Sequence, residues 1–183
     1  MIFVSSNKHK FLEISRMMEN KGITVEWKRM KYEEIQADTT EEISLDSARK
    51  LSASIGEPFF LEDTGIFLDS LGGFPGPYSS YVQSKIGNSG ILRLIEGRNR
   101  SAYFLTVITY FDGRLFHQFS GKLNGTIAQS ERGNLGFGYD PIFIPDGFDI
   151  TLGEMELESK NRISHRSKAL QALVDYLLAN HGI

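Results

Sequence analysis

Two adjacent carboxylates, Glu62 and Asp63, stand at the end of a short apolar run and precede a loop rich in glycine and proline at 72–77. An apolar run of this length, bounded by turn signals, is typical of a buried β-strand. Successive strand residues point to opposite faces, so only one of the two acids can face a given site. Taken alone, the pair is best explained by a strand that runs out into solvent with both acids hydrated. A functional interpretation therefore depends on the rest of the chain.

Length and charge limit the class of protein. A chain of 183 residues fits one domain of ordinary size, residues 1–183, with enough length to bury a core. Its net charge of −3 disfavours non-specific nucleic-acid binding. The absence of cysteine excludes disulfides and thiolate metal sites, and the four histidines lack zinc-type spacing. Because we find neither a signal-peptide pattern nor an apolar run long enough for a membrane span, we expect a soluble cytoplasmic protein with no membrane partner.

Hydrophobic periodicity predicts alternating strands and helices outside the run that begins at Phe59. Capping residues mark the ends of two of the helices: Thr39 with Glu42 forms a candidate capping box, Gly56 is a stop signal, and Ser164 can cap the last helix. We expect strands at 1–4 and 23–30, and helices at 8–18, 40–55, 90–96 and 165–178.

A hairpin is the clearest local signal. The segment 101–111 is rich in β-branched and aromatic residues, and Asp112-Gly113 is a strong turn before a return strand at 115–128. Gly121 and Gly125 within the return strand suggest bends or a bulge. Since this hairpin must be antiparallel while strands and helices alternate elsewhere, we expect an α/β fold with a mixed sheet.

Two polar clusters in the first third of the chain could bind a charged ligand. The segment 5–10, SSNKHK, lies where a strand passes into a helix, and such a helix start favours an anion. The acids Glu62 and Asp63, with Glu34 as a distant partner, suit Mg²⁺, or one of them could activate a water. Taken alone, the first cluster is better explained by an ordinary polar helix cap with solvated lysines.

Two further clusters lie in the last third. In 136–141, GFGYDP, two glycines flank Phe137 and allow the backbone to approach a planar ligand, although a tight turn with a small aromatic cluster is the alternative. In 160–168, KNRISHRSK, His165 and Arg166 fall in the first turn of a helix, the unfavourable end for cations. A bound anion would resolve that conflict, whereas a solvated charged face is the simpler explanation. Together the four clusters describe a nucleoside triphosphate pocket with Mg²⁺.

The segments 5–14, 61–79, 136–145 and 164–170, in this order and spacing, resemble the inosine triphosphate pyrophosphatase family. The resemblance runs from about Phe3 to Tyr176. It implies Mg²⁺-dependent hydrolysis of ITP, dITP or XTP, which are non-standard purine nucleoside triphosphates, to the monophosphate and pyrophosphate. It also implies a long mixed β-sheet flanked by helices, two lobes with a central substrate cleft, and a homodimer.

The resemblance also assigns roles to individual residues. Glu34 and Asp63 would hold Mg²⁺ with Glu62 in support, and Asp63 would be the base that activates water. Arg166 or Lys160 can donate a hydrogen bond to the O6 of hypoxanthine or xanthine, where adenine offers no acceptor. The substrate-binding residues that the resemblance implies are Ser5, Ser6, Asn7, Lys8, His9, Lys10, Lys50, Thr64, Phe137, Gly138, Tyr139, Asp140, Lys160, His165 and Arg166.

The chain departs from the family pattern in three places. Ser6 replaces the usual glycine of the first motif and gives up its backbone freedom. Thr64 replaces the common serine but keeps the hydroxyl. Ser80 and Tyr81 stand where many members carry a basic residue, which could alter contacts with phosphate.

Three other functions compete with this hypothesis. A Maf-like nucleotide pyrophosphatase would perform the same reaction on pyrimidine or modified nucleotides. A non-catalytic nucleotide sensor would keep the pocket without turnover. A nucleic-acid-binding module would bind with strong salt dependence, which the acidic net charge disfavours.

Overall fold

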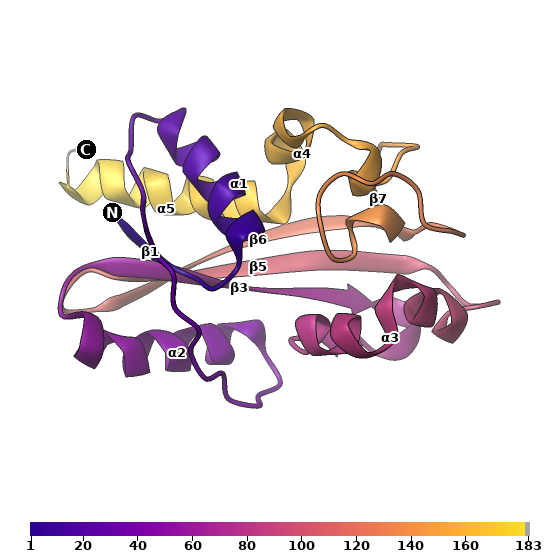
Figure 1. Cartoon of the computed structure of the whole chain (residues 1–183), viewed down its shortest axis with the longest axis horizontal. Helices are drawn as coiled ribbons and strands as arrows, with labels where there is room; N and C mark the ends of the chain where they lie inside the picture. Colours follow the sequence, from indigo (N-terminus) through magenta and orange to yellow (C-terminus); the bar gives the residue numbers. More distant parts are fainter. Residues whose placement is uncertain (182–183) are drawn as a thin grey trace.

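A computed structural model describes residues 1–181 of the chain (Figure 1). Strands and α-helices alternate in its first half, and the three short 3-10 helices are labelled η. The elements are, in order, β1 (Ile2–Val4), α1 (Lys8–Glu19), β2 (Glu26–Lys28), α2 (Thr40–Ile55), β3 (Phe59–Leu68), η1 (Asp69–Leu71), β4 (Pro75–Gly76), α3 (Ser79–Leu94), β5 (Ser101–Phe111), β6 (Phe116–Ile127), η2 (Asp140–Ile142), β7 (Phe143–Pro145), η3 (Leu152–Glu154), α4 (Leu157–Ile163) and α5 (His165–His181).

The described strands form one mixed sheet in the order β2-β1-β3-β5-β6-β7, with β4 added beside β3. β1 pairs in parallel with both β2 and β3, and the remaining pairs are antiparallel. The expected mixed α/β sheet is therefore confirmed. None of the helices in residues 1–181 combines the length and apolarity needed to cross a membrane.

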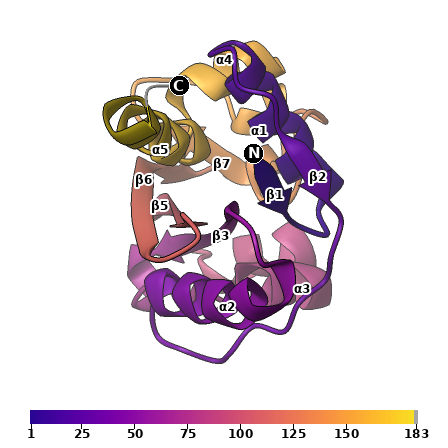
Figure 2. The ribbon, with the colours of Figure 1, turned by 90° about the vertical axis from the view of Figure 1, so that its left-hand side faces the viewer.

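Helices cover both faces of this sheet (Figures 1 and 2). α1 and α5 lie over one face, where Phe60 and Ile108 of the sheet pack against Leu173 of α5. α2 lies over the other face, where Phe59 and Leu61 share a core with Leu51 of α2. Alternate residues of β3 thus enter two different cores, as the period of a strand requires.

One edge of β3 is only partly covered. β5 pairs with β3 along its whole length, from Phe59 to Leu68. On the opposite edge β1 reaches only Phe60, and β4 pairs only with Ile66 and Phe67. The backbone between these two contacts, residues 61–65, has no strand beside it on that edge. The Glu62-Asp63-Thr64 segment lies in this gap.

Two expectations about strands need correction. Glu62 and Asp63 do not end a strand, because β3 continues through them to Leu68. Gly121 and Gly125 do not mark a bulge, because β5 and β6 pair in unbroken register from Ser101 to Phe111. A Cβ on Gly121 would lie 2.1 Å from the backbone oxygen of His165, and one on Gly125 would lie 2.2 Å from that of Ile144. These glycines allow neighbouring backbone to pack directly on β6.

Other local expectations are confirmed. Thr39 caps α2 by accepting a hydrogen bond from Glu42 N at 3.2 Å, and Gly56 ends the helix in the left-handed conformation at φ 72°. The hairpin of β5 and β6 turns at Asp112, whose carboxylate accepts from the N–H groups of Arg114 and Leu115. Ser164 caps α5 by accepting from Ser167 N at 3.1 Å. The second expected strand is shorter than its sequence pattern, at Glu26–Lys28.

Candidate active site

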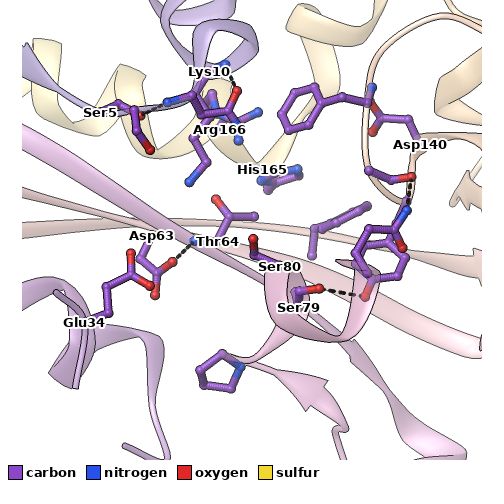
Figure 3. Close-up of a pocket in the computed structure, with 18 of the residues that line it drawn as sticks. Ser5, Lys10, Glu34, Asp63, Thr64, Ser79, Ser80, Asp140, His165 and Arg166 are labelled. Atoms are coloured by element: carbon purple, nitrogen blue, oxygen red, sulfur yellow. Dashed lines mark hydrogen bonds between the residues drawn. The ribbon is translucent and has the colours of Figure 1, made fainter. Parts of the chain in front are cut away.

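A cavity of about 440 Å³ opens at the gap in the edge of β3 (Figure 3). Segments far apart in the sequence converge on it. Its walls are formed by residues 5–7 and Lys10, by Lys31, Tyr32 and Glu34, by Asp63 and Thr64, by Pro77, Ser79, Ser80 and Gln83, by Phe104, by residues 137–140, and by Lys160, His165 and Arg166.

The start of α1 forms one wall. The Asn7 side chain accepts hydrogen bonds from the backbone N–H groups of His9 at 2.9 Å and Lys10 at 3.3 Å. Because these two donors already have an acceptor, attraction of an anion here depends on Lys10 and on the helix dipole. No non-glycine residue within 1–181 has a positive φ, so Ser6 does not need the backbone freedom of the glycine it replaces.

Glu34 and Asp63 form the acidic end of the cavity, where Figure 3 shows their carboxylates close together. Asp63 Oδ1 accepts from Thr64 N at 2.8 Å, whereas its buried Oδ2 has no hydrogen-bond partner in residues 1–181. Burial raises the pKa of Asp63 from 3.8 to about 6 against the opposing charge of Lys10, and the charges of Glu34 and Glu62 also raise it. This carboxylate is thus poised to accept a proton or a cation.

Glu62 has different partners from its neighbour in sequence. Arg166 binds both of its oxygens, from Nε at 2.9 Å and from Nη2 at 3.0 Å, and Lys10 Nζ lies 3.0 Å from Oε1. Burial opposes ionisation, but the charges of Arg166 and Lys10 prevail and lower the pKa of Glu62. The structure therefore brings Glu62 together with two cations rather than with Glu34.

Buried carboxylates also neutralise the charges around the start of α5, which corrects the expectation of a shared ligand anion. Arg166 Nη1 donates to Glu13, and Lys160 Nζ donates to Glu13 at 2.7 Å and to Asp140 at 2.5 Å. Together with Lys10 on Glu62, these pairs form a network of three cations and three carboxylates, and such a network is acceptable in a core only when its members are paired. Here the protein supplies the anions itself.

The loop 137–140 closes the opposite end of the cavity. Asp140 Oδ2 accepts from Phe137 N at 2.8 Å, and the Gly138 oxygen accepts from Gln83 Nε2 at 3.0 Å and from Asn88 Nδ2 at 3.2 Å. The Phe137 ring stacks on His9 with a centroid separation of 5.2 Å. The Arg166 guanidinium carbon lies 5.6 Å from the centroid of the same ring. A half-buried aromatic face beside an arginine suits a planar, electron-rich ligand.

His165 lines the cavity from the first turn of α5. Its Nδ1 lies 2.6 Å from Thr106 Oγ1, and its ring stacks on Phe104 at 4.6 Å. Burial, reinforced by the charges of Arg166 and Lys160, lowers the pKa of His165 well below its ordinary value. The imidazole is therefore neutral at pH 7.

Most predicted residues meet at this cavity, but four do not line it: Glu62, described above, and Lys50, Lys8 and His9. Lys50 lies on the exposed side of α2, where its Nζ pairs with Asp46 at 2.7 Å. Lys8 is exposed outside the cavity. His9 contributes only through its stacking on Phe137. The loop after η1 contributes Pro77 to the wall, so it walls the pocket in part.

Several residues were not anticipated. Glu13 is a buried acid three positions after Lys10, and this helical spacing could have placed both on one face. Ser79 of α3 links β3 to β4, because its Oγ accepts from Ile66 N at 2.7 Å and donates to the Gly76 oxygen at 2.6 Å. Gln83 and Thr106 carry no recognisable signal in the sequence.

Comparison with known proteins extends over nearly the whole chain. The profile of the Ham1 family matches residues 1–176. A protein of Thermococcus kodakarensis named dITP/XTP pyrophosphatase is 49% identical over 179 residues, which cover 97% of each chain. A Korarchaeum cryptofilum protein of the same name is 48% identical, with 97% of this chain and 96% of that one covered. A HAM1 protein from Coxiella burnetii has a similar solved structure, with a TM-score of 0.84 at 27% identity, and the match covers 98% of this chain and 99% of that one.

Proposed function

Since the chain belongs to the Ham1 family, we propose that it hydrolyses ITP, dITP and XTP to the nucleoside monophosphate and pyrophosphate with the help of Mg²⁺. Two relatives named dITP/XTP pyrophosphatase share 49% and 48% of their aligned residues with this chain over nearly its full length, which supports this substrate class. The observation that carries the proposal is that the two ends of one cavity differ in their chemistry. It has two carboxylates at one end and an aromatic face beside an arginine at the other.

The size of the cavity suits such a substrate. A volume of about 440 Å³ falls within the range of pockets that enclose small organic ligands. The phosphates would extend toward Ser5, Lys10 and Thr64, and the purine would lie against Phe137. This orientation places the most negative part of the substrate beside Lys10 and the planar part beside an aromatic ring.

Glu34 and Asp63 fit a divalent cation. Asp63 Oδ2 is buried without a hydrogen-bond partner in the described part of the chain, and a second carboxylate stands beside it. No group of three or more His, Cys, Asp or Glu side chains within residues 1–181 is arranged to hold a metal by itself. Mg²⁺ commonly takes one or two protein carboxylates and completes its shell with water and substrate phosphates. When bound, it would neutralise charge on the triphosphate.

Asp63 would accept the proton of the attacking water. A carboxylate with a pKa of about 6 is mostly ionised at neutral pH, yet it is a stronger base than an ordinary aspartate. Hydrolysis of a phosphoanhydride requires alignment and charge stabilisation rather than a covalent intermediate with the protein. Lys10 and Thr64 would hold the phosphates in line with that water.

Selection of the base would depend on Arg166 and the network that holds it. Three of its N–H groups donate to Glu62 and Glu13, which fixes the guanidinium plane and leaves two donors for a ligand. The O6 of hypoxanthine or xanthine can accept such a donor. The 6-amino group of adenine cannot, and would leave the donor unpaired.

A substrate panel tests the proposal. ITP, dITP, XTP, ATP, GTP, dTTP and UTP would be compared at low concentration with Mg²⁺, and pyrophosphate release measured. We expect kcat/KM for ITP or XTP to exceed that for ATP and the pyrimidines at least tenfold, about 1.4 kcal/mol of discrimination. A preference for dTTP or UTP would instead support a Maf-like enzyme. Hydrolysis in ¹⁸O-labelled water, with the label located in one product, would identify the phosphorus attacked.

The proposal extends to the setting in which the protein acts. A homodimer in the cytoplasm, acting on free nucleotides rather than on nucleic acid, is what the family resemblance suggests. The net charge of −3 supports action on free nucleotides, because a negatively charged protein surface would repel the phosphate backbone of a nucleic acid.

A further inference from the structure

Three side chains at the cavity wall form a continuous hydrogen-bonded chain. Thr64 Oγ1 lies 2.6 Å from Thr106 Oγ1, which lies 2.6 Å from His165 Nδ1. Thr64 and His165 line the cavity, whereas Thr106 is fully buried in β5 between them. Thr106 therefore connects two points of the cavity wall without touching a ligand itself.

The packing of α5 on the sheet creates this chain. Thr64 and Thr106 are directly opposite in the pairing of β3 with β5, and Thr106 is opposite Gly121 of β6. Only a glycine at position 121 lets the backbone of His165 come so close, and the Phe104 ring fixes the imidazole plane. Nδ1 is thereby directed at Thr106, and no hydrogen-bond partner is found for Nε2 within residues 1–181.

Each hydroxyl has a single proton, so the chain has two complete arrangements. In one, Thr64 donates to Thr106 and Thr106 donates to Nδ1, which leaves the imidazole proton on Nε2. In the other, Nδ1–H donates to Thr106 and Thr106 donates to Thr64, whose own proton then points to the cavity. A mixed arrangement would leave the buried Thr106 hydroxyl proton without an acceptor, at a cost of about 1–3 kcal/mol.

We propose that Thr64, Thr106 and His165 act as a relay in which a phosphate that accepts from the Thr64 hydroxyl sets the proton of His165 on Nδ1. Nε2 then presents a lone pair to the nucleoside and accepts from one of its O–H or N–H groups. The relay rests on the proposed function, because it couples the triphosphate end of that cavity to its nucleoside end. Thr106 is a positioning residue in this scheme.

The tautomer can be observed directly. ¹⁵N-labelled histidine in the full chain would be followed by NMR, with His165→Asn identifying the resonances, before and after addition of inorganic tripolyphosphate and Mg²⁺. We expect the anion to shift the His165 proton to Nδ1. A tautomer that does not change, or failure of tripolyphosphate to bind, would overturn the relay. Since this probe contains no purine, a tautomer shift without ITP hydrolysis would refute the proposed function alone.

Two variants of Thr106 separate the relay from packing. Thr106→Ser keeps the hydroxyl and should retain the anion-dependent shift, with kcat/KM for ITP within about twofold of the parent. Thr106→Val keeps the shape, should abolish the shift, and should lower kcat/KM about tenfold, the value of one net hydrogen bond. Thr64→Val should also abolish the anion-dependent shift, so the relay can still be tested if Thr106→Val does not fold. A shift that persists in either valine variant would contradict the proposal.

Substrate analogues then identify the donor. Dideoxyinosine triphosphate lacks the ribose hydroxyls, and 1-methylinosine triphosphate lacks the purine N1–H. The analogue that lacks the true donor should be hydrolysed about tenfold less well by the parent, and equally by parent and Thr106→Val. If Thr106→Val lowers the hydrolysis of both analogues as much as that of ITP, Nε2 has no ligand donor and the relay is wrong.

Discussion

Glu62 and Asp63 are neighbours in β3, but their carboxylates lie on opposite faces of the sheet. Glu62 accepts two hydrogen bonds from Arg166 of α5, while Asp63 meets Glu34 on the side of α2. The period of a strand thus assigns the two acids to separate tasks. One secures the helix that carries His165 and Arg166, and the other is available for chemistry.

Replacement of Asp63 by asparagine should remove turnover and keep binding. Asparagine has nearly the same shape but cannot accept the proton of water at neutral pH, so we expect kcat for ITP to fall by about 10²–10⁴. Binding of ITP, measured by calorimetry, should remain detectable. Asp69→Asn is the matched control, because Asp69 is exposed in η1 outside the cavity. Normal turnover by Asp63→Asn would show that another group is the base.

The same variant should be more stable than the parent when metal is absent. The folded-state pKa of Asp63 is raised from 3.8 to about 6, so the folded protein binds the proton more tightly than the unfolded chain does. Ionisation therefore lowers stability as pH rises from about 3.8 to about 6. At pH 7 in EDTA, Asp63→Asn should unfold a few degrees higher, and the difference should vanish near pH 3.5. Mg²⁺ should raise the melting temperature of the parent only; an equal rise for both proteins would argue against a metal on Asp63.

Sequence patterns predicted most elements because their signals are local. The Thr39 cap, the Gly56 stop and the Asp112 turn depend on a few neighbouring residues, and each appears as expected. Gly121 could not be interpreted correctly, because its role depends on α5, whose residues are more than forty positions away. A glycine in a strand has the same local appearance whether it allows a bulge or a close approach.

The sequence predicted which residues gather at the site better than it predicted which of them pair with each other. Lysine, arginine and acid clusters were expected around one ligand, and most of them meet at the cavity. The sequence could not show that Glu13 and Glu62 pair with Arg166, because pairing of buried charges is decided by tertiary packing. For the same reason Lys50 was expected at the phosphates, although it faces solvent beside Asp46.

We expect replacement of Glu62 to lower stability and replacement of Glu34 to lower the apparent affinity for Mg²⁺. Glu62→Gln removes the buried counter-charge of Lys10 and leaves Arg166 with Glu13 alone, so we expect a loss of about 3–5 kcal/mol in the free energy of unfolding. Glu34→Gln removes an exposed acid, so stability should stay within about 0.5 kcal/mol. The apparent affinity for Mg²⁺ during ITP hydrolysis should fall instead. Chemical denaturation measures stability, and a Mg²⁺ titration of activity measures the apparent affinity for the metal. If Glu62→Gln lowered the affinity and Glu34→Gln lowered the stability, Glu62 would belong to the metal site.

Two lysines offer a matched test of the phosphate end. Lys10 lines the cavity and contacts Glu62, whereas Lys50 is half-exposed and lies outside it. Lys10→Met should raise KM for ITP at least tenfold, through loss of a charge-assisted contact with phosphate. Lys50→Met should leave kcat and KM within about twofold, since exposed ion pairs contribute little. A large effect of Lys50→Met would mean that α2 moves toward the substrate.

Gly121 should be intolerant of even one methyl group. A Cβ there would lie 2.1 Å from the oxygen of His165 and 2.5 Å from the nitrogen of Ala169, and both are backbone atoms that cannot rotate away. Gly121→Ala must therefore push the start of α5 off β6, at a cost of about 1–3 kcal/mol. His165 and Arg166 would move with the helix, so kcat/KM should fall in the fraction that stays folded. Ser120→Ala, one residue earlier and exposed, should change neither property. Full activity and stability of Gly121→Ala would mean that α5 does not need this contact to hold His165 against Thr106.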